Sequence, residues 1–316
     1  MSSAIVAIRR SKLNGFMVCL LEGPNANPAC LEWETNLAML HTVLTCKTPR
    51  AALETRMSAP KASRPARDRQ FASTLAHGLQ LLRCFTPEAA VLSNRQLSEL
   101  SGLSKPTVSR YTYTLIELGY LKVDPVSGKF QLGNAVLTLS YPLLANIALR
   151  QVVRSPMREL AERLGCSVSL CMRERLSMVY VETSRSRSLR AQRYSDIGMS
   201  HPIIATSNGR AYLAACSADE RNTLFNQIRV KTPEHWERWG ESALDMIQFW
   251  GRHGFCYSHG EYRPDVATVG VPYRPSSGGE LYVFNCVLGS QFVKPGQLEN
   301  EVGPALLEMT SVLPYA

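Results

Sequence analysis

The sequence is poor in the features that mark secreted, membrane-spanning and zinc-binding proteins. Its nine cysteines are scattered, odd in number and never spaced as Cys-x-x-Cys, which argues against a disulfide framework or a zinc ribbon. We therefore expect reduced thiols in the core of a cytoplasmic protein. No apolar run approaches the length needed to cross a bilayer, so no membrane partner is expected.

Signatures of common enzyme classes are also missing. The chain has no Walker-type phosphate loop, no Gly-x-Ser-x-Gly elbow and no His-Glu-x-x-His pair, so we expect no enzymatic activity, no cofactor and no metal. The alternative is a metal- or thiol-dependent sensor or enzyme in the C-terminal part, using His253, Cys256 and His259 as ligands or Cys256 and Cys286 as reactive thiols. Gly254 is expected to end a helix before Cys256, so the three ligands need not share one face.

Positive charge is concentrated in one segment. The 316 residues carry 35 Lys and Arg against 26 Asp and Glu, a formal net charge of +9. Between Ser58 and Ser140 there are 10 basic and 5 acidic residues, whereas from Tyr141 to the end there are 19 and 17. Local density of Lys and Arg attracts nucleic acid, so the first segment has either a polyanionic partner or simply a solvated basic face.

The N-terminal stretch lacks regular patterning. Residues 1–57 show no sustained helical or strand period, and the basic tail that starts at Ser58 has the composition of a flexible segment. We therefore expect residues 1–69 to be poorly ordered or extended. Because Met57 stands at the start of the tail, we hypothesise that the native chain begins there and that residues 1–56 do not belong to it.

Patterned sequence begins near residue 70. Apolar residues at three- and four-residue spacing predict one face of a first helix, which Pro87 stops; they are Phe71, Leu75, Leu79, Leu82 and Phe85. Ser93 and Gln96 have the spacing of a capping box, in which each side chain accepts a hydrogen bond from the other residue's backbone N–H. A short second helix is expected after Ser93.

The following residues complete a familiar order of elements over 70–133. Gly102 makes a turn, and Ser104 caps a third helix that runs to Leu118. Two short alternating segments, Tyr120–Asp124 and Lys129–Leu132, predict a hairpin with turn residues at its tip. Helix, helix, turn, helix and hairpin together predict a winged helix-turn-helix DNA-binding domain.

Polar side chains gather at the start of the third helix, where a recognition helix meets the base edges. Arg110 is our preferred base reader, because a guanidinium can bind guanine through two hydrogen bonds. Thr107 and Ser109 offer hydroxyls to the groove, while Lys105 and, on the hairpin, Lys129 are expected to contact phosphates. The expected partner is double-stranded operator DNA.

The rest of the chain predicts a linker and a second domain. An apolar segment over 134–154 predicts a linker helix that Pro142 should kink or split. Over 155–316 we expect helices at Pro156–Leu164, Gly209–Cys216, Ala218–Ile228, Ser242–His253 and Gln297–Leu313. Strands are expected at Ser167–Met172, Met178–Glu182, Phe255–His259, Thr268–Tyr273 and Leu281–Cys286. This mixture predicts an α+β fold with a largely antiparallel sheet.

Several of these segments together resemble the IclR family of bacterial transcriptional regulators. The stretches that carry the resemblance are Leu97–Arg110, Leu118–Leu121, Ser127–Gly133, Ala205–Leu213 and Gly254–Pro264, and it extends from Phe71 to near the C-terminus. The resemblance implies a winged helix-turn-helix, a linker helix and a C-terminal effector domain shaped like a GAF or PAS sensor. It also implies homodimers or dimers of dimers on palindromic operators.

The resemblance further implies that a small organic acid, an aromatic one among the candidates, binds the effector domain and modulates operator binding. Carried over by position, the site is lined by Ser207, Asn208, Gly209, Ser258, His259, Thr268, Phe284 and Cys286. Backbone N–H groups at a helix start suit a carboxylate, and Arg193 or Arg210 would add positive charge. Alternatively, Ser207 and Asn208 only cap their helix.

Two positions depart from the family's pattern. Phe284 stands where related proteins often have a small Ser or Ala, and Thr268 stands where they often have Cys. The size and shape of the ligand therefore do not follow from the resemblance. Ligand binding and DNA binding are expected to be coupled through the linker around Pro142, with both events biasing one set of conformations.

Overall fold

The computed structural model describes residues 8–13, 16–21, 70–187, 195–276 and 278–313, and the chain divides into two compact units, 1–71 and 72–316. In the first unit, β1 (Ile8–Leu13) pairs with β2 (Phe16–Leu21) in antiparallel register. The sequence patterns predicted no regular element there, so this hairpin was not anticipated. The expected start at Met57 and the basic tail from Ser58 lie outside the described residues.

Three short helices open the second unit in the predicted order: α2 (Ser73–Leu82), α3 (Asn94–Ser101) and α4 (Lys105–Glu117). The expected capping box begins α3, because the Ser93 hydroxyl accepts the Gln96 N–H while the Gln96 side chain accepts the Ser93 N–H at 2.9 Å. Gly102 ends α3 at a φ of +70°, a conformation that a side chain would strain. Ser104 then caps α4 through the Thr107 N–H.

The wing is a hairpin of β3 (Leu121–Val123) and β4 (Phe130–Leu132). Leu92, just before α3, exchanges two backbone hydrogen bonds with Phe130, at 2.9 and 2.8 Å, and so joins the wing to the helices. A small core is shared by all these elements; it comprises Leu81, Leu92, Leu97, Val108, Leu115 and Leu121. This arrangement confirms the predicted winged helix-turn-helix.

The first helix does not bury the face that its periodicity marks as apolar. Leu81 is fully buried, whereas Leu75 and Leu79 are 64% and 51% exposed, and Phe71 before them is 66% exposed. The apolar face exists, but the described part of the chain leaves it uncovered. A pattern of apolar spacing identifies a face without saying what packs against it.

Two helices follow the wing, α5 (Ala135–Ala145) and α6 (Leu149–Leu164), and they are bent by 89° at the break between them. The break falls just after Pro142, which lies inside α5. α6 starts at Leu149 rather than at Pro156, because its buried face of Val153, Met157 and Leu160 carries the helix through the missing proline N–H. The linker boundary expected at residue 154 therefore falls inside α6.

No single helix among the described residues is both long and apolar enough to span a bilayer. By length and composition, α5 and α6 meet that test only when taken together as the bent pair.

The C-terminal part (residues 149–313) is built on a six-stranded antiparallel sheet in the order β7-β6-β5-β10-β9-β8. Its strands are β5 (Ser167–Glu174), β6 (Ser177–Arg185), β7 (Ser200–Pro202), β8 (Cys256–His259), β9 (Val266–Tyr273) and β10 (Tyr282–Gly289). Leu170 pairs with Glu182 and Cys171 with Tyr180, so Val181 is the extra residue of a β-bulge. The sheet confirms the predicted α+β class, although β7 was not predicted.

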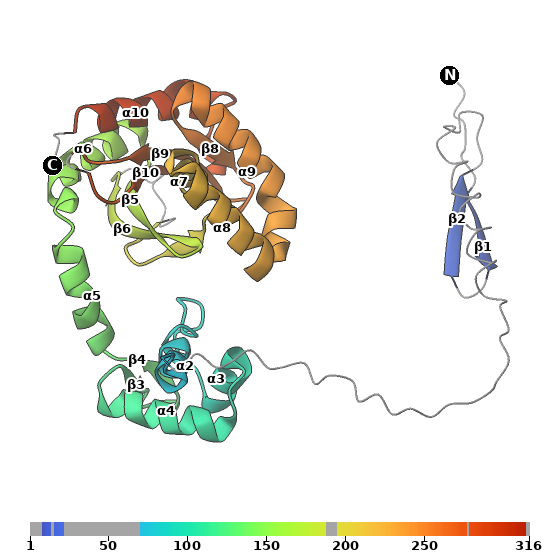
Figure 1. The fold of residues 1–316 in the computed structure, drawn as a ribbon, viewed down its shortest axis with the longest axis vertical. Helices are drawn as coiled ribbons and strands as arrows, with labels where there is room; N and C mark the ends of the chain where they lie inside the picture. The colour runs from blue at the N-terminus through green and yellow to red at the C-terminus, as the bar shows by residue number, and fades with distance from the viewer. Residues whose placement is uncertain (1–7, 14–15, 22–69, 188–194, 277, 314–316) are drawn as a thin grey trace, which may run out of the picture. The chain divides into compact units, whose positions relative to one another are not determined.

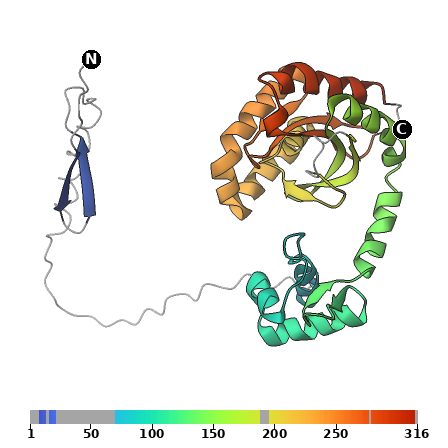
Figure 2. The ribbon, with the colours of Figure 1, turned by 180° about the vertical axis from the view of Figure 1, so that it is seen from behind.

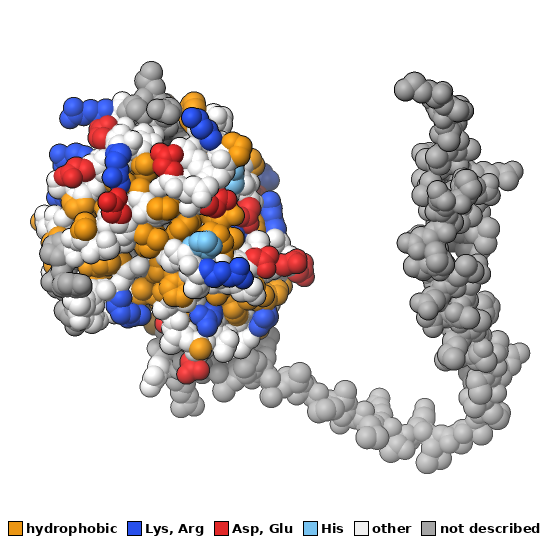
Figure 3. All heavy atoms as spheres, turned by 90° about the horizontal axis from the view of Figure 1, so that it is seen from above, with side chains coloured by type: hydrophobic (Ala, Val, Ile, Leu, Met, Phe, Trp, Pro, Cys, Tyr) orange, Lys and Arg blue, Asp and Glu red, His pale blue; other side chains and the backbone are white. Residues whose placement is uncertain are grey.

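Helices cover both faces of this sheet (Figures 1 and 2). α6 and α10 (Gly303–Ser311) share one core with Val168, Val269 and Phe284. On the other face lies α7 (Ser207–Ala215), packed against α9 (Pro233–His253), which in turn contacts α8 (Ala218–Lys231). The face seen in Figure 3 intersperses Lys and Arg with Asp and Glu, as their near-equal numbers in this part predict.

Candidate functional site

α4 presents a polar face close to the turn that precedes it. Val108 and Leu115 anchor the helix in the core, whereas Lys105, Ser109 and Arg110 are exposed. The cationic and hydroxyl side chains of α4 therefore face solvent, and the opposite face of the helix packs into the core. This is the arrangement that a recognition helix needs, since its contacts require a rigid support.

Two other residues of α4 change the expected set of contacts. The Thr107 hydroxyl lies 2.8 Å from the Ser104 hydroxyl, so it takes part in the helix cap as well as facing outward. Tyr113, one turn after Ser109, is 67% exposed and was missed by the sequence analysis. Its spacing of four residues from Ser109 is the signal that places both on one face.

The tip of the wing is fixed by a side-chain turn. The Asp124 carboxylate accepts hydrogen bonds from the Ser127 hydroxyl at 2.5 Å and from the Ser127 N–H at 2.9 Å. These bonds lower the pKa of Asp124. Lys129 is exposed just after Gly128, and Val126 at the tip is 93% exposed. The wing thus carries a cation on a well-defined turn.

A small cavity of about 30 Å³ lies on the α7 face of the sheet. Its lining comes from β6 to β10 and from the connections beside them: Tyr180, His201, Ala205, Thr206, Ser258, Glu261, Tyr262, Arg263, Val266, Thr268, Asn285 and Val287. Small-molecule sites in proteins usually have about 300–1,000 Å³, so this space is much smaller than such a site. A small-molecule ligand must therefore widen it.

Aromatic rings and one cation give this cavity its chemistry. The His201 ring stands edge-on to Tyr180 at 5.8 Å and to Tyr262 at 5.5 Å between centroids. Burial, and then the charge of Arg263, lower the pKa of His201, so its ring is neutral at neutral pH. Burial raises the pKa of Tyr180, whose hydroxyl keeps its proton and accepts a 3.4 Å bond from Asn285 Nδ2.

The expected residues at the start of α7 make bonds within the protein. Ser207 Oγ donates to Thr268 Oγ1 at 2.8 Å, and Asn208 Nδ2 donates to a buried cysteine sulfur at 3.4 Å. The Gly209 N–H donates to Asn208 Oδ1 at 2.9 Å and to Thr206 Oγ1 at 3.4 Å. Ser207, Asn208 and Gly209 do not line the cavity, and the residue that caps α7 is Thr206 rather than Ser207 or Asn208.

Two glycines let α7 lie directly on the sheet. A Cβ at Gly209 would stand 1.9 Å from the Ile203 carbonyl oxygen, and one at Gly270 would stand 2.7 Å from the Ser207 carbonyl oxygen. Backbone therefore meets backbone at these points, and no side chain fits between. The position of α7 beside the cavity depends on both glycines.

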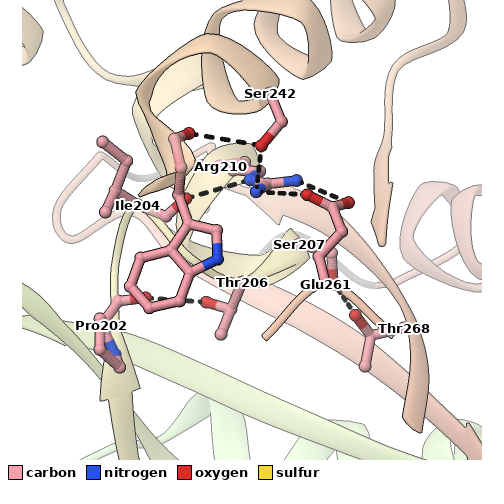
Figure 4. Close-up of polar contacts among 9 residues, drawn as sticks. Pro202, Ile204, Thr206, Ser207, Arg210, Ser242, Glu261 and Thr268 are labelled. Atoms are coloured by element: carbon pink, nitrogen blue, oxygen red, sulfur yellow. Dashed lines mark hydrogen bonds and ion pairs between the residues drawn. The ribbon is translucent and has the colours of Figure 1, made fainter. Parts of the chain in front are cut away.

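Arg210 is fully buried and satisfied by neighbouring groups (Figure 4). Its guanidinium donates two bonds to the Glu261 carboxylate, at 3.0 and 2.8 Å, one to Ser242 Oγ at 2.8 Å and one to the Ile204 carbonyl at 3.0 Å. Burial opposes ionisation of Glu261, but the bonds and charge of Arg210 outweigh it and lower the pKa of that carboxyl. Arg210 therefore supports the fold rather than lining the cavity, and Arg193 lies outside the described residues.

The remaining expected ligand residues divide between two faces of the sheet. Ser258 and Thr268 line the cavity. His259 is exposed at the end of β8. Phe284 and Cys286 point into the core beneath α6 and α10, because side chains alternate along β10. β10 presents Asn285 and Val287 to the cavity instead, and each of them follows one of the expected residues directly in the sequence.

The residues of the metal- or thiol-dependent alternative do not form a reactive group. His253 stacks on Phe249 with centroids 4.1 Å apart, while Cys256 Sγ donates to a backbone carbonyl at 3.4 Å. In the described segments, no three His, Cys, Asp or Glu side chains are grouped to hold a metal ion. Burial raises the pKa of Cys256 to about 12, and a hydrogen bond with Cys166 followed by burial raises that of Cys286. Both thiols are therefore poor nucleophiles.

A buried ion pair joins α6 to the sheet. Glu182 Oε2 lies 3.0 Å from Arg150 Nη2 and 3.1 Å from Arg154 Nε, and the Arg150 and Glu182 side chains are 10% and 9% exposed. Glu182 follows Tyr180 by two residues, but the bulge at Val181 turns it to the opposite face from the cavity. One strand thus contacts both the cavity and the helix that leads to the wing.

Two family models match the chain: "IclR helix-turn-helix domain" over residues 74–125 and "Bacterial transcriptional regulator IclR C-terminal" over residues 142–305. The HTH-type transcriptional regulator TsaQ1/TsaQ2 of Comamonas testosteroni is 34% identical, covering 75% of this chain and 85% of its own. The p-hydroxybenzoate hydroxylase transcriptional activator of Acinetobacter baylyi is 26% identical, with coverage of 78% and 92%. Sequence similarity thus extends across both the helix-turn-helix and the C-terminal part.

Solved structures share the same architecture. An IclR family transcriptional regulator from Brucella abortus is 38% identical, has a TM-score of 0.68 and is aligned over 79% of this chain and 94% of its own. An IclR homologue from Microbacterium hydrocarbonoxydans, solved with 4-hydroxybenzoate, has a TM-score of 0.57 at 18% identity, over 77% and 100% of the two chains. The second likeness concerns the fold alone.

Proposed function

The chain belongs to the IclR family of bacterial transcriptional regulators, and from this we propose that it binds a specific operator under the control of a small organic acid. The family consists of transcriptional regulators rather than enzymes. The observation that carries the proposal is the exposed polar face of α4, held by a buried core and flanked by a cationic wing. We place the protein in the cytoplasm, where its operator lies.

In the proposed DNA complex, α4 enters the major groove. Arg110 reads a guanine through its guanidinium, Ser109 and Thr107 reach neighbouring edges or phosphates, and Lys105 binds the backbone. Lys129 on the wing binds the adjacent backbone. Support comes from the exposure of Lys105, Ser109, Arg110 and Lys129, and the exposed Tyr113 extends the same face.

The operator is identified by selection from a random double-stranded DNA library, and binding is measured by gel shift. We expect Arg110→Ala to weaken the selected site by about 1–3 kcal/mol and to relax specificity at one position. Arg252→Ala, on the last turn of α9, is the matched control and should bind like the wild type. If Arg110→Ala leaves affinity and specificity unchanged, the groove assignment fails.

The proposed effector site is the cavity on the α7 face, and the proposed effector is an organic acid with a flat, aromatic body. Tyr180, His201 and Tyr262 offer ring edges and faces, and Arg263 supplies positive charge for a carboxylate. Arg263 also donates to both carboxylate oxygens of Asp265, at 3.2 and 2.7 Å, so a ligand carboxylate would share this guanidinium with Asp265. The p-hydroxybenzoate-related names of two similar proteins support this choice. A thermal-shift screen of organic acids tests it, because a ligand that binds the folded state raises the melting temperature.

The small volume of the cavity supports a coupling mechanism. A small-molecule ligand must displace part of the lining, which includes Tyr180 of β6. Two residues further along β6, Glu182 faces the other side of the sheet and pairs with Arg150 and Arg154 of α6. We propose that opening the cavity shifts β6 at the bulge and so moves α6 and the linker. Ligand and DNA would then bias one conformational equilibrium, which makes each affinity depend on the other.

The protein is proposed to act as a homodimer or a dimer of dimers. An apolar hollow of about 620 Å³ lies among α2, α4 and α5, where Leu75, Leu79, Leu118 and Leu139 are each more than half exposed. A surface of this kind on a folded protein marks an interaction site. A second copy is the proposed occupant, because two symmetric helix-turn-helix units match a palindromic operator.

A further inference from the structure

The tip of the wing carries the most exposed large apolar side chain among the described residues. Val126 is 93% exposed, compared with 81% for Val230 and 73% for Leu137. Pro125 beside it is exposed as well. Single apolar residues are common on protein surfaces, so exposure alone assigns no role. What distinguishes Val126 is the turn that holds it and the charges on either side.

The turn that holds Val126 is closed by several hydrogen bonds. The Asp124 N–H donates to the Lys129 carbonyl at 2.7 Å, and the Gly128 N–H donates to the Asp124 carbonyl at 2.9 Å. The side-chain turn at Asp124 adds two more bonds. Pro125 fixes its own φ, and Gly128 adopts a φ of +68°, which a side chain would strain. Val126 is therefore presented on a rigid support, which lowers the entropy cost of inserting it into a partner.

Two cations flank this apolar tip. Lys122 on β3 and Lys129 just after the turn are both exposed. Because side chains alternate along a strand and Leu121 is buried, Lys122 lies on the face of β3 away from the core. The Asp124 carboxylate, the acidic group of the turn, is engaged by Ser127. A protruding apolar residue between two lysines matches a polyanion that has a recess between its charges.

The minor groove of DNA is a recess of this kind, about 6 Å wide, with a phosphate backbone along each side. When α4 lies in the major groove and Lys129 binds the adjacent backbone, as proposed above, the groove beyond that backbone is the minor groove. Architectural proteins insert apolar side chains there between two base pairs, which unstacks the pairs and bends the duplex. The steps that deform most readily are a pyrimidine followed by a purine, such as TA or CA.

Resting on the DNA complex proposed above, we infer that Val126 inserts into the minor groove at a pyrimidine–purine step and bends the operator there. This residue then contributes specificity without a hydrogen bond to any base, because a stiffer step costs more free energy to deform. Lys122 and Lys129 bind the backbones that border the groove. Arg110 and Val126 thus recognise the operator differently, the first through base edges and the second through the deformability of the duplex.

The first test compares the sites that the full-length wild type and Val126→Ser select from a random double-stranded DNA library. In the wild-type sites, one position beside the α4 contacts should favour TA or CA over the stiff AA step by at least about fivefold, the low end of what one base pair contributes. With Val126→Ser this preference should fall below about twofold. Val126→Ile should keep it, because its side chain is larger and still apolar.

The second test measures bending by energy transfer between dyes at the two ends of a selected site. Val126→Ser should reduce the bend by at least about 20°, the low end of the kinks that apolar wedges produce. The slope of log K against log salt should stay unchanged, because no charge is lost.

Val230→Ser is the matched control, since it makes the same change at an exposed position on α8. It should keep both the bend and the step preference. An unchanged bend or an unchanged step preference in Val126→Ser would overturn the inference while leaving operator binding by α4 intact. If the wild type selects no sequence from the library, the proposed operator function fails instead.

Discussion

Arg150 donates a 2.7 Å hydrogen bond to the backbone carbonyl of Leu144, across the break between α5 and α6. The same guanidinium faces Glu182 on β6. One side chain therefore contacts the end of α5, the start of α6 and a strand of the six-stranded sheet. In the coupling proposed above, a displacement of β6 acts on the linker through this contact.

Glu182→Gln removes the carboxylate that two arginines face. We expect a loss of about 3–5 kcal/mol in the free energy of unfolding, because Arg150 would be left buried without a counter-charge. Urea unfolding measures it. Glu99→Gln is the control, since the Glu99 side chain is 59% exposed in its pair with Arg95, and its unfolding midpoint should not move. A Glu182→Gln midpoint equal to the wild type would contradict the role of the pair.

Gly209→Ala and Gly251→Ala place the same methyl group in two helices with opposite expected effects. At Gly209 the new Cβ meets a backbone oxygen, so we expect destabilisation of about 1–3 kcal/mol or more. At Gly251 nothing lies within 4 Å, and alanine should stabilise by about 0.4–1 kcal/mol. The melting temperatures of the two variants are measured side by side. Changes of the same sign would contradict the close approach of α7 to the Ile203 backbone.

The stability of the protein should depend on pH through His201. Its pKa is lowered in the folded state, so below about pH 6.5 the unfolded chain takes up a proton that the folded chain does not. Stability due to this group is therefore complete above that pH and falls as the pH drops toward the folded pKa. Unfolding midpoints between pH 5 and 8 should show this slope, and His201→Gln should flatten it. His259→Gln, at the exposed end of β8, should keep the wild-type slope.

Lys129→Ala tests the wing contact through the salt dependence of operator binding. Loss of one phosphate contact should lower the slope of log K against log salt by about 1 and weaken all DNA sequences alike. Fluorescence anisotropy at several salt concentrations gives the slope. Lys231→Ala, in the last turn of α8, is the control and should leave it unchanged. An altered sequence preference for Lys129→Ala would argue for base contact instead.

Leu79→Glu should prevent self-association. The charge would lie in the apolar hollow of α2, α4 and α5, so light scattering should show a shift toward a smaller assembly, with weaker binding to a palindromic site. Val230→Lys replaces an apolar residue that is 81% exposed on α8 and is the control, which should keep the wild-type mass. A Leu79→Glu protein of unchanged mass would rule out this face as the interface.

Local signals predicted the local structure well. The capping box of Ser93 and Gln96, the turn at Gly102 and the hairpin around Ser127 are each set by residues within a few positions of one another. Such interactions can be inferred from spacing alone. The class of the C-terminal fold followed in the same way from the order of strands and helices.

Packing between residues far apart in the sequence could not be predicted from the spacing of residue types. Pro156 lies inside α6 because distant sheet residues bury Val153, Met157 and Leu160 around it. The choice between Cys286 and Asn285 in the cavity depends on the register and facing of β10, where a shift of one residue exchanges the two faces. Arg210 was a candidate partner for a ligand carboxylate because it is positively charged. The structure shows that its guanidinium instead binds the Glu261 carboxylate.

The small volume of the cavity sets the threshold of the proposed sensor. When only a fraction of molecules is open, the apparent dissociation constant is the intrinsic one divided by that fraction. The dose at which the regulator responds would therefore be tuned by how tightly His201 and its neighbours close the cavity, as well as by the contacts made to the ligand. Looser packing would give a response at lower dose with no change in ligand chemistry.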